Sequence, residues 1–239
     1  MMNHNFLLLF VLAHLTGDYI LQTNKIAKMK SEGLEGVTIH TLIVGLVQIV
    51  LLSCYGIRGS IAGVIGTVIH YGIDCLKLRL VRRFSRMELI LYLFDQGLHF
   101  LSLVLLTLFL APDSGWVEKY IPYIRLLTAV ALLLGMAAVT AKTVARGFLE
   151  NVRNQSFFLG KERWWDTLTV VIIAVMVVLL ALASLPLPIG LLIAILGVFP
   201  YGRLQKKAYR YDGQAFLLKY ITLLMFVVLA LWIGGYIGY

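Results

Sequence analysis

Charged residues are scarce in this sequence. They make up 14% of its 239 residues, against about a quarter in an average soluble chain. Hydrophobic residues make up 60%, and the mean hydropathy is +0.89. This composition excludes an ordinary soluble domain and is typical of a protein embedded in a membrane. Cysteine is scarce too. Cys54 is expected near the outer end of one membrane span and Cys75 near the inner end of the next, so we expect no disulfide between them. Neither has CxxC spacing, and we expect two small buried residues.

Long apolar runs are what the sequence has instead. Crossing ~30 Å of hydrocarbon at about 1.5 Å per residue takes about 20 apolar residues. Eight runs approach that length: 5–22, 37–57, 60–80, 88–111, 123–143, 167–185, 187–200 and 215–237. They lack the alternation of barrel strands, and a spanning segment must satisfy its own backbone hydrogen bonds. The sequence therefore predicts an all-α, polytopic transmembrane bundle of about eight helices.

Positive charge is distributed unevenly between the connections of these runs. The net charge is +9, and most lysines and arginines follow the first, third, fifth and seventh runs. The other connections hold only Arg58, Lys119 and Arg125. Because basic residues mark the cytoplasmic side, we expect both termini outside and the four basic connections inside. This topology explains the basic residues without nucleic acid, and it allows contact with anionic lipid.

Ionisable residues interrupt the first four apolar runs. In mid-bilayer each costs at least ~2.5 kcal/mol unless it is paired or hydrated. Three of the runs carry a histidine and an aspartate four residues apart, which places each pair on one face of a helix, and the second run carries a single histidine. The residues are His14 and Asp18, His40, His70 and Asp74, and Asp95 and His99.

The order within each pair matches the expected direction of its helix. The first and third apolar segments are expected to enter the membrane from outside, and in them the histidine precedes the aspartate. The fourth is expected to cross in the opposite direction, and in it Asp95 precedes His99. Each histidine is thus expected nearer mid-membrane and each aspartate nearer the cytoplasm, with His40 at the aspartate level. We expect the seven groups to converge in two layers. Interhelical hydrogen bonding is the alternative, but three matched pairs favour a binding site.

Imidazole and carboxylate together suit a divalent metal ion. Zinc is expected first, with manganese or iron as alternatives, and seven candidates exceed the needs of one tetrahedral zinc. We therefore expect one or two ions, and a pair ~3.5–4 Å apart would activate water for hydrolysis. An aspartate that does not bind metal would serve as general base, and the candidates are Asp18, Asp74 and Asp95.

Four further polar residues are candidates for contact with substrate. Gln22 continues the face of the first pair, and Gln96 adjoins Asp95. Lys142 and Arg146 form another i, i+4 pair, at the end of the fifth run. Basic groups there would suit a phosphate or a carboxylate, although setting the topology is the other interpretation of these two residues.

The histidines divide the chain unequally, since none follows residue 99. We expect a single membrane domain with two halves. Residues 1–111 would form a four-helix half that holds the metal, and residues 112–239 a four-helix scaffold or substrate wall.

Four sequence motifs within the first hundred residues carry a resemblance to a known family. They are AHLTGDYILQTNKIA, GVTIHTL, VIHYGIDCLK and LFDQGLHF. The combination resembles the membrane-protein family called domain of unknown function 3307 (DUF3307). The resemblance implies a multi-span protein of the bacterial inner membrane and picks out the seven histidines and aspartates, with Gln22 and Gln96. It implies no activity.

Two functions from different classes remain open. The first is a metal-dependent hydrolase whose site faces the cytoplasmic leaflet and cleaves an ester or phosphoester of an amphiphilic substrate. The second is a divalent-metal or proton-coupled transporter that uses the same cluster. Seven ligand-type groups would hold an ion tightly, which favours the enzyme. The sequence leaves the oligomeric state open.

Overall fold

The described part of the chain consists of helices and the short connections between them. The computed structural model describes residues 3–84, 87–112, 116–137, 140, 218, 221–222, 225–226, 228–230 and 232–233. No strand occurs among them, which confirms the all-α class for this part. The chain divides into two compact units, Met1–Ala131 and Leu132–Tyr239. The predicted division at residue 111 stays a prediction.

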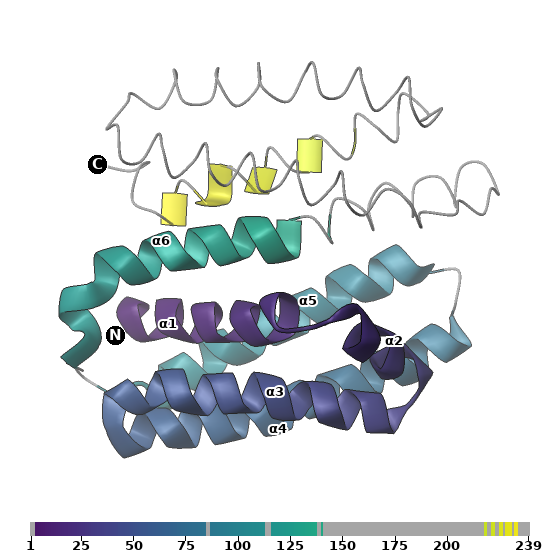
Figure 1. Ribbon diagram of the computed structural model, residues 1–239, viewed down its shortest axis with the longest axis horizontal. Helices are drawn as coiled ribbons and strands as arrows, with labels where there is room; N and C mark the ends of the chain where they lie inside the picture. Colours follow the sequence, from purple (N-terminus) through teal and green to yellow (C-terminus); the bar gives the residue numbers. More distant parts are fainter. Residues whose placement is uncertain are drawn as a thin grey trace. The chain divides into compact units, whose positions relative to one another are not determined.

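The first unit is built from six α-helices and three short helical segments within the described residues. The α-helices are α1 His4–Leu15, α2 Asn24–Glu32, α3 Leu34–Leu52, α4 Gly56–Arg83, α5 Glu88–Leu110 and α6 Ile121–Ala131. The short segments are the π-helical η1 Thr16–Ile20 and the 3-10 turns η2 Ser53–Tyr55 and η4 Trp116–Tyr120. A further π-helical segment, η5 Leu132–Ala137, begins the second unit. Figure 1 shows α3 alongside α4 and α1 alongside α6.

The α3–α4 hairpin forms one side of the first unit. Its turn ends at Gly56, whose φ of 71° lies in the left-handed region that favours glycine. Gly63 lets the two helices approach closely, because a Cβ there would lie 3.0 Å from the backbone of Ile49. The hairpin thereby fixes the depth of the ionisable residues of α4 relative to those of α3.

Helix α1 is anchored in the interior by aromatic side chains. Phe6 and Phe10 are fully buried, and Phe6 stacks edge to face on Tyr55 with ring centroids 5.1 Å apart. Asn3 caps the helix by accepting a hydrogen bond from the Phe6 backbone N–H at 2.9 Å. The Asn3 amide also donates to the carbonyl of Pro112 at 2.8 Å. These contacts hold α1 against the ends of α3 and α5.

Two helical stretches are long and apolar enough to cross a membrane, namely Leu34–Arg83 and Leu89–Leu110. A third stretch is long and apolar enough only if two segments are counted together, His4–Ile20 and Asn24–Glu32. The chain bends by 88° between them. The described residues therefore contain two or three such stretches. The stretch Leu34–Arg83 contains both helices of the α3–α4 hairpin, for which the sequence predicted two separate spans, 37–57 and 60–80. The predicted spans 167–185 and 187–200 lie outside the described residues, and 123–143 and 215–237 lie only partly within them.

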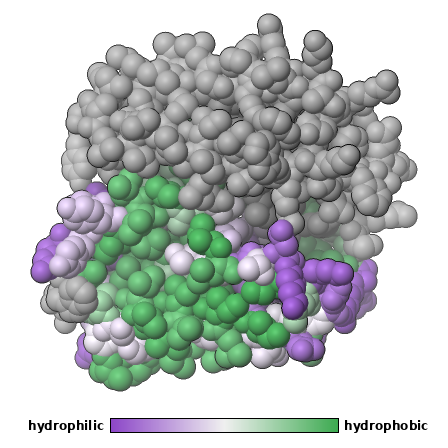
Figure 2. Space-filling view, viewed as in Figure 1, coloured by the Kyte–Doolittle hydropathy of each residue, from purple (hydrophilic) through white to green (hydrophobic). Residues whose placement is uncertain are grey.

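The surface of the described helices is apolar over a broad area. Figure 2 shows this area with hydrophilic side chains gathered on either side of it. Leu42 and Leu46 on α3 and Val68 on α4 are among the large hydrophobic residues of the described helices that are exposed. An apolar surface of this extent is rare on soluble monomers and suits contact with lipid.

Candidate metal centre

The seven predicted ligand residues lie together inside the first unit. They come from α1, η1, α3, α4 and α5, and none is more than 6% exposed. In the described part of the chain, atoms able to bind metal form three groups, each with its atoms within 4.8 Å of one another. They are the histidine group (His14, His70, His99), the His40 group (Asp18, His40, His70) and the Asp95 group (Asp74, Asp95, His99).

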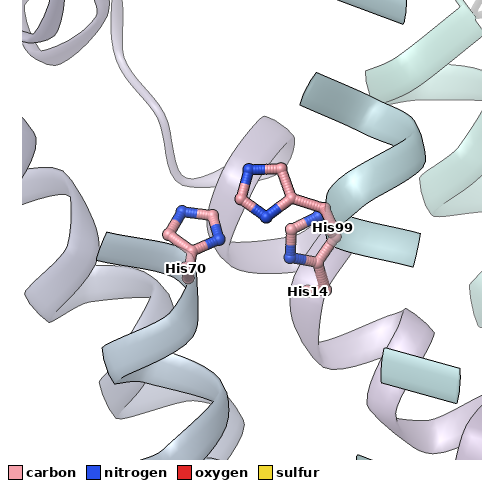
Figure 3. Close-up of side chains that lie close together, drawn as sticks. All are labelled: His14, His70 and His99. Atoms are coloured by element: carbon pink, nitrogen blue, oxygen red, sulfur yellow. The ribbon is translucent and has the colours of Figure 1, made fainter. Parts of the chain in front are cut away.

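The histidine group brings together three rings from three different helices. Figure 3 shows the rings of His14, His70 and His99 gathered around a common space. The ring centroid of His14 lies 5.3 Å from that of His70 and 5.1 Å from that of His99, and the last two lie 4.3 Å apart. Three histidines with one open position form a zinc site that can activate water.

The aspartates lie next to this group, and each contacts a histidine. Asp18 Oδ1 is 2.9 Å from His40 Nε2, and Asp74 Oδ2 is 3.2 Å from His70 Nε2. Asp95 Oδ1 is 3.4 Å from His99 Nε2. His40 contacts both Asp18 and Asp74, and its Nε2 also lies 3.3 Å from His70 Nε2, so its predicted depth in the membrane stays a prediction. Contacts of this kind orient imidazoles that bind metal.

Asp18 lies on a widened turn of helix that the sequence did not predict. The π-helical segment η1 continues α1 through Asp18, and such turns often occur at functional sites. Its residue Gly17 lies against the backbone of α3, because a Cβ there would be 2.7 Å from Val44 Cα. This close approach sets the position of Asp18 beside His40.

Gly17→Ala is expected to destabilise the protein by about 1–3 kcal/mol, because η1 must shift away from α3 to accommodate the methyl group. The same shift should weaken metal binding by moving Asp18. Detergent-solubilised protein would be compared by thermal unfolding and zinc titration. Gly97→Ala is the matched control, since nothing lies within 4 Å of a Cβ at that position of α5. Equal effects of the two substitutions would contradict the packing described here.

Lys30 reaches the cluster from α2, and the sequence did not single it out. Its Nζ lies 2.8 Å from Asp74 Oδ2 and 3.6 Å from Asp18 Oδ1, and its side chain is 15% exposed. It lies outside the two stretches that could each cross a membrane alone. Burial lowers the pKa of Lys30, but the carboxylates of Asp18 and Asp74 outweigh burial and raise this pKa above its ordinary value. Lys30 is therefore charged at neutral pH.

A second lysine pairs with the remaining aspartate. Lys77 Nζ lies 2.6 Å from Asp95 Oδ2 and donates a hydrogen bond to it. Lys77 follows Asp74 by three residues and His70 by seven, so it shares their face of α4. The helical spacing that revealed the histidines would also have revealed this lysine.

Gln96 extends the cluster towards two tyrosines. Its Nε2 donates to Asp95 Oδ2 at 2.9 Å, and its Oε1 accepts from the Tyr19 hydroxyl at 2.7 Å. The hydroxyls of Tyr19 and Tyr92 lie 3.3 Å apart. Gln96 thus holds the Asp95 carboxylate between itself and Lys77, and its predicted contact with substrate stays a prediction.

The other residues predicted to contact substrate are not placed at the cluster by any described contact. The Oε1 of Gln22 is buried and has no hydrogen-bond partner among the described residues. Lys142 and Arg146 lie outside the described residues. Their roles stay predictions.

Several ligand-type atoms of the cluster have no hydrogen bond within the described part of the chain. Asp74 Oδ1, Asp95 Oδ1 and His99 Nε2, which belong to one group, are all buried without a hydrogen bond. They face one another instead, since His99 Nε2 lies 3.4 Å from Asp95 Oδ1 and 3.7 Å from Asp74 Oδ1. A divalent ion could bind all three atoms, because both carboxylate oxygen and imidazole nitrogen suit it. The cluster can therefore hold a metal ion.

The family that the sequence motifs resembled can now be tested against the whole chain. A family model described as "Protein of unknown function (DUF3307)" matches residues 6–127. The chain belongs to the DUF3307 family. The match contains all seven ligand-type residues, Lys30 and Lys77. No curated protein and no solved structure matches the chain. The family assigns no activity, so the function must be inferred from the metal centre.

Proposed function

We propose that the protein is a metal-dependent hydrolase of the bacterial cytoplasmic membrane that cleaves an ester or phosphoester of an amphiphilic substrate. The observation that carries the proposal is the buried cluster of histidines and aspartates. It contains three groups, and within each group the ligand atoms lie within 4.8 Å of one another. Zinc is the expected ion, because three imidazoles with an open position suit it. The proposal includes eight spans with both termini outside.

The apolar surface and the placement of positive charge support a site near the cytoplasmic leaflet. Lys77 follows the Asp74 ligand on α4, and the same helix ends in Arg82 and Arg83. Helix α2 contributes Lys25 and further lysines. Because basic residues mark the cytoplasmic side, the cluster would lie towards the inner leaflet, where anionic headgroups are available as substrates.

The chemistry follows from the groups around the ion. A bound divalent ion lowers the pKa of a water molecule and polarises a carbonyl or phosphoryl oxygen. Asp74 Oδ1, buried without a hydrogen bond, can accept the proton of that water. Lys30 and Lys77 offset the charge of the aspartates and attract an anionic headgroup.

Elemental analysis and a hydrolysis assay would test the proposal together. The purified protein is expected to contain zinc and to release fatty acid or phosphate from mixed micelles of anionic phospholipid. His99→Ala should lose both the metal and the activity, because His99 belongs to two of the three groups. His4→Ala is the control, since His4 is exposed at the start of α1.

Other outcomes would redirect the assignment. A protein without metal would overturn the proposal. Bound metal without hydrolysis, together with metal or proton flux in proteoliposomes, would assign the cluster to a transporter instead.

A further inference from the structure

The three groups of ligand atoms overlap, which limits how many ions they can hold. His70 belongs to both the histidine group and the His40 group, and His99 to both the histidine group and the Asp95 group. If each ring binds one ion through one nitrogen, an ion on the histidine group uses His70 and His99. The other two groups then each lack one ligand. The cluster can therefore hold one ion on the histidine group, or up to two on the groups that contain aspartate.

The lysines are placed on the aspartates and not on the histidine group. Lys30 Nζ contacts Asp18 of the His40 group and Asp74 of the Asp95 group. Lys77 Nζ contacts Asp95, the other aspartate of the Asp95 group. Among the described ion pairs, none joins a lysine to the histidine group, whose members are neutral ligands when they bind metal. Both aspartate groups are thus already occupied by cations.

Charge balance favours the same arrangement. The cluster contains three carboxylates and two ammonium groups, which leaves one negative charge when the histidines are neutral. One divalent ion would leave a single positive charge, and a hydroxide on the ion would cancel it. Two divalent ions beside both lysines would leave three positive charges in a buried site, or two if they carried one hydroxide. Uncompensated buried charge is costly, so one ion is favoured while the lysines stay in place.

Lys30 is brought to this position by a docked helix. Helix α2 crosses the start of α3 so closely that a Cβ on Gly36 would overlap the backbone of Met29. At the end of α2, the Arg82 guanidinium donates to the Glu32 carbonyl at 2.7 Å. The backbone that carries Lys30 is thus packed against α3 and bonded to the end of α4.

We infer that Lys30 and Lys77 restrict the centre to one metal ion, on the histidine group, by occupying the carboxylates of the His40 and Asp95 groups that two ions would need. The inference rests on the proposed function and adds the number of ions and their position. The ammonium group of Lys30 takes over part of the role of a second metal, since it offsets Asp18 and Asp74 and offers N–H donors to an anionic oxygen of the substrate.

Counting zinc ions per chain in the double variant Lys30→Met/Lys77→Met and in a control tests this inference. The wild-type protein should hold one tightly bound zinc, and the double variant should hold two, because the carboxylates of the His40 and Asp95 groups become free together. Lys28→Met is the matched control on the same helix. Its lysine is 77% exposed and pairs with Glu32 at 3.7 Å, so it should leave the count at one.

A second pair of variants locates the added ion. His40→Ala should leave the wild-type count at one, but in the Lys30→Met/Lys77→Met background it should reduce the count from two to one. Two ions in the wild type, or one ion in a folded double variant, would overturn the inference and leave the metal-dependent function standing. No ion in the wild type would overturn both. Lys30→Gln/Lys77→Gln provides the same count if the methionine variant fails to fold.

Discussion

Replacing Asp74 with alanine should destabilise the protein by about 3–5 kcal/mol, the usual cost of leaving one partner of a buried ion pair unpaired. Asp74 is fully buried, and Lys30 Nζ lies 2.8 Å from its Oδ2. The substitution also removes the contact of the carboxylate with His70 at 3.2 Å. Reversible unfolding in mixed micelles with increasing denaturing detergent would measure the loss.

A double substitution separates the ion pair from simple packing. Asp74→Ala with Lys30→Met should recover part of the loss, because no unpaired ammonium group remains. The exposed pair of Lys28 and Glu32 is the matched control, and Glu32→Ala should cost at most about 1 kcal/mol. If Asp74→Ala proved as mild as Glu32→Ala, the buried pair would not be a stabilising part of the fold.

Replacing His70 with alanine should abolish tight zinc binding, because His70 belongs to both the histidine group and the His40 group. The loss of affinity should exceed the about 10–100-fold that follows removal of a hydrogen-bond partner of a ligand. Hydrolysis should fall with it, since the ion activates the water. Competition with a zinc-binding dye would measure the affinity.

Comparison with a second histidine variant identifies the group that binds. If the histidine group holds the ion, His14→Ala should lose zinc as His70→Ala does. Zinc lost in His70→Ala but retained in His14→Ala would point to the His40 group. Zinc retained in both variants would point to the Asp95 group and contradict the assignment to three histidines.

The convergence of the seven histidines and aspartates could be predicted because it depends on rules that the sequence obeys locally. Ionisable residues are rare in apolar runs, and i, i+4 spacing fixes their face on a regular helix. Helix α5, Glu88–Leu110, ends within one residue of the predicted run 88–111. Helix α4, Gly56–Arg83, extends beyond the predicted 60–80, because it starts at the left-handed Gly56 and continues into its basic end.

The position of Lys30 could not be predicted, because it depends on how helices cross. A lysine after an apolar run ordinarily remains in water and marks the cytoplasmic side. Here the chain bends by 88° after η1 and α2 packs on Gly36, which turns Lys30 inwards. Neither the bend nor the close crossing is visible in hydrophobic periodicity. The π-helical turn that carries Asp18 escaped prediction for the same reason.

The hydrogen bond from Asn3 to Pro112 joins the start of α1 to the chain two residues after α5, so it can form only once α5 has been synthesised. The histidine group takes one residue from α1 and one from α5, so the centre stays incomplete until α5 has been translated and inserted. The α3–α4 hairpin can form earlier, with His40 and His70 already in place. A metal ion held by the histidine group would therefore enter late, and it would join helices that are synthesised far apart in time.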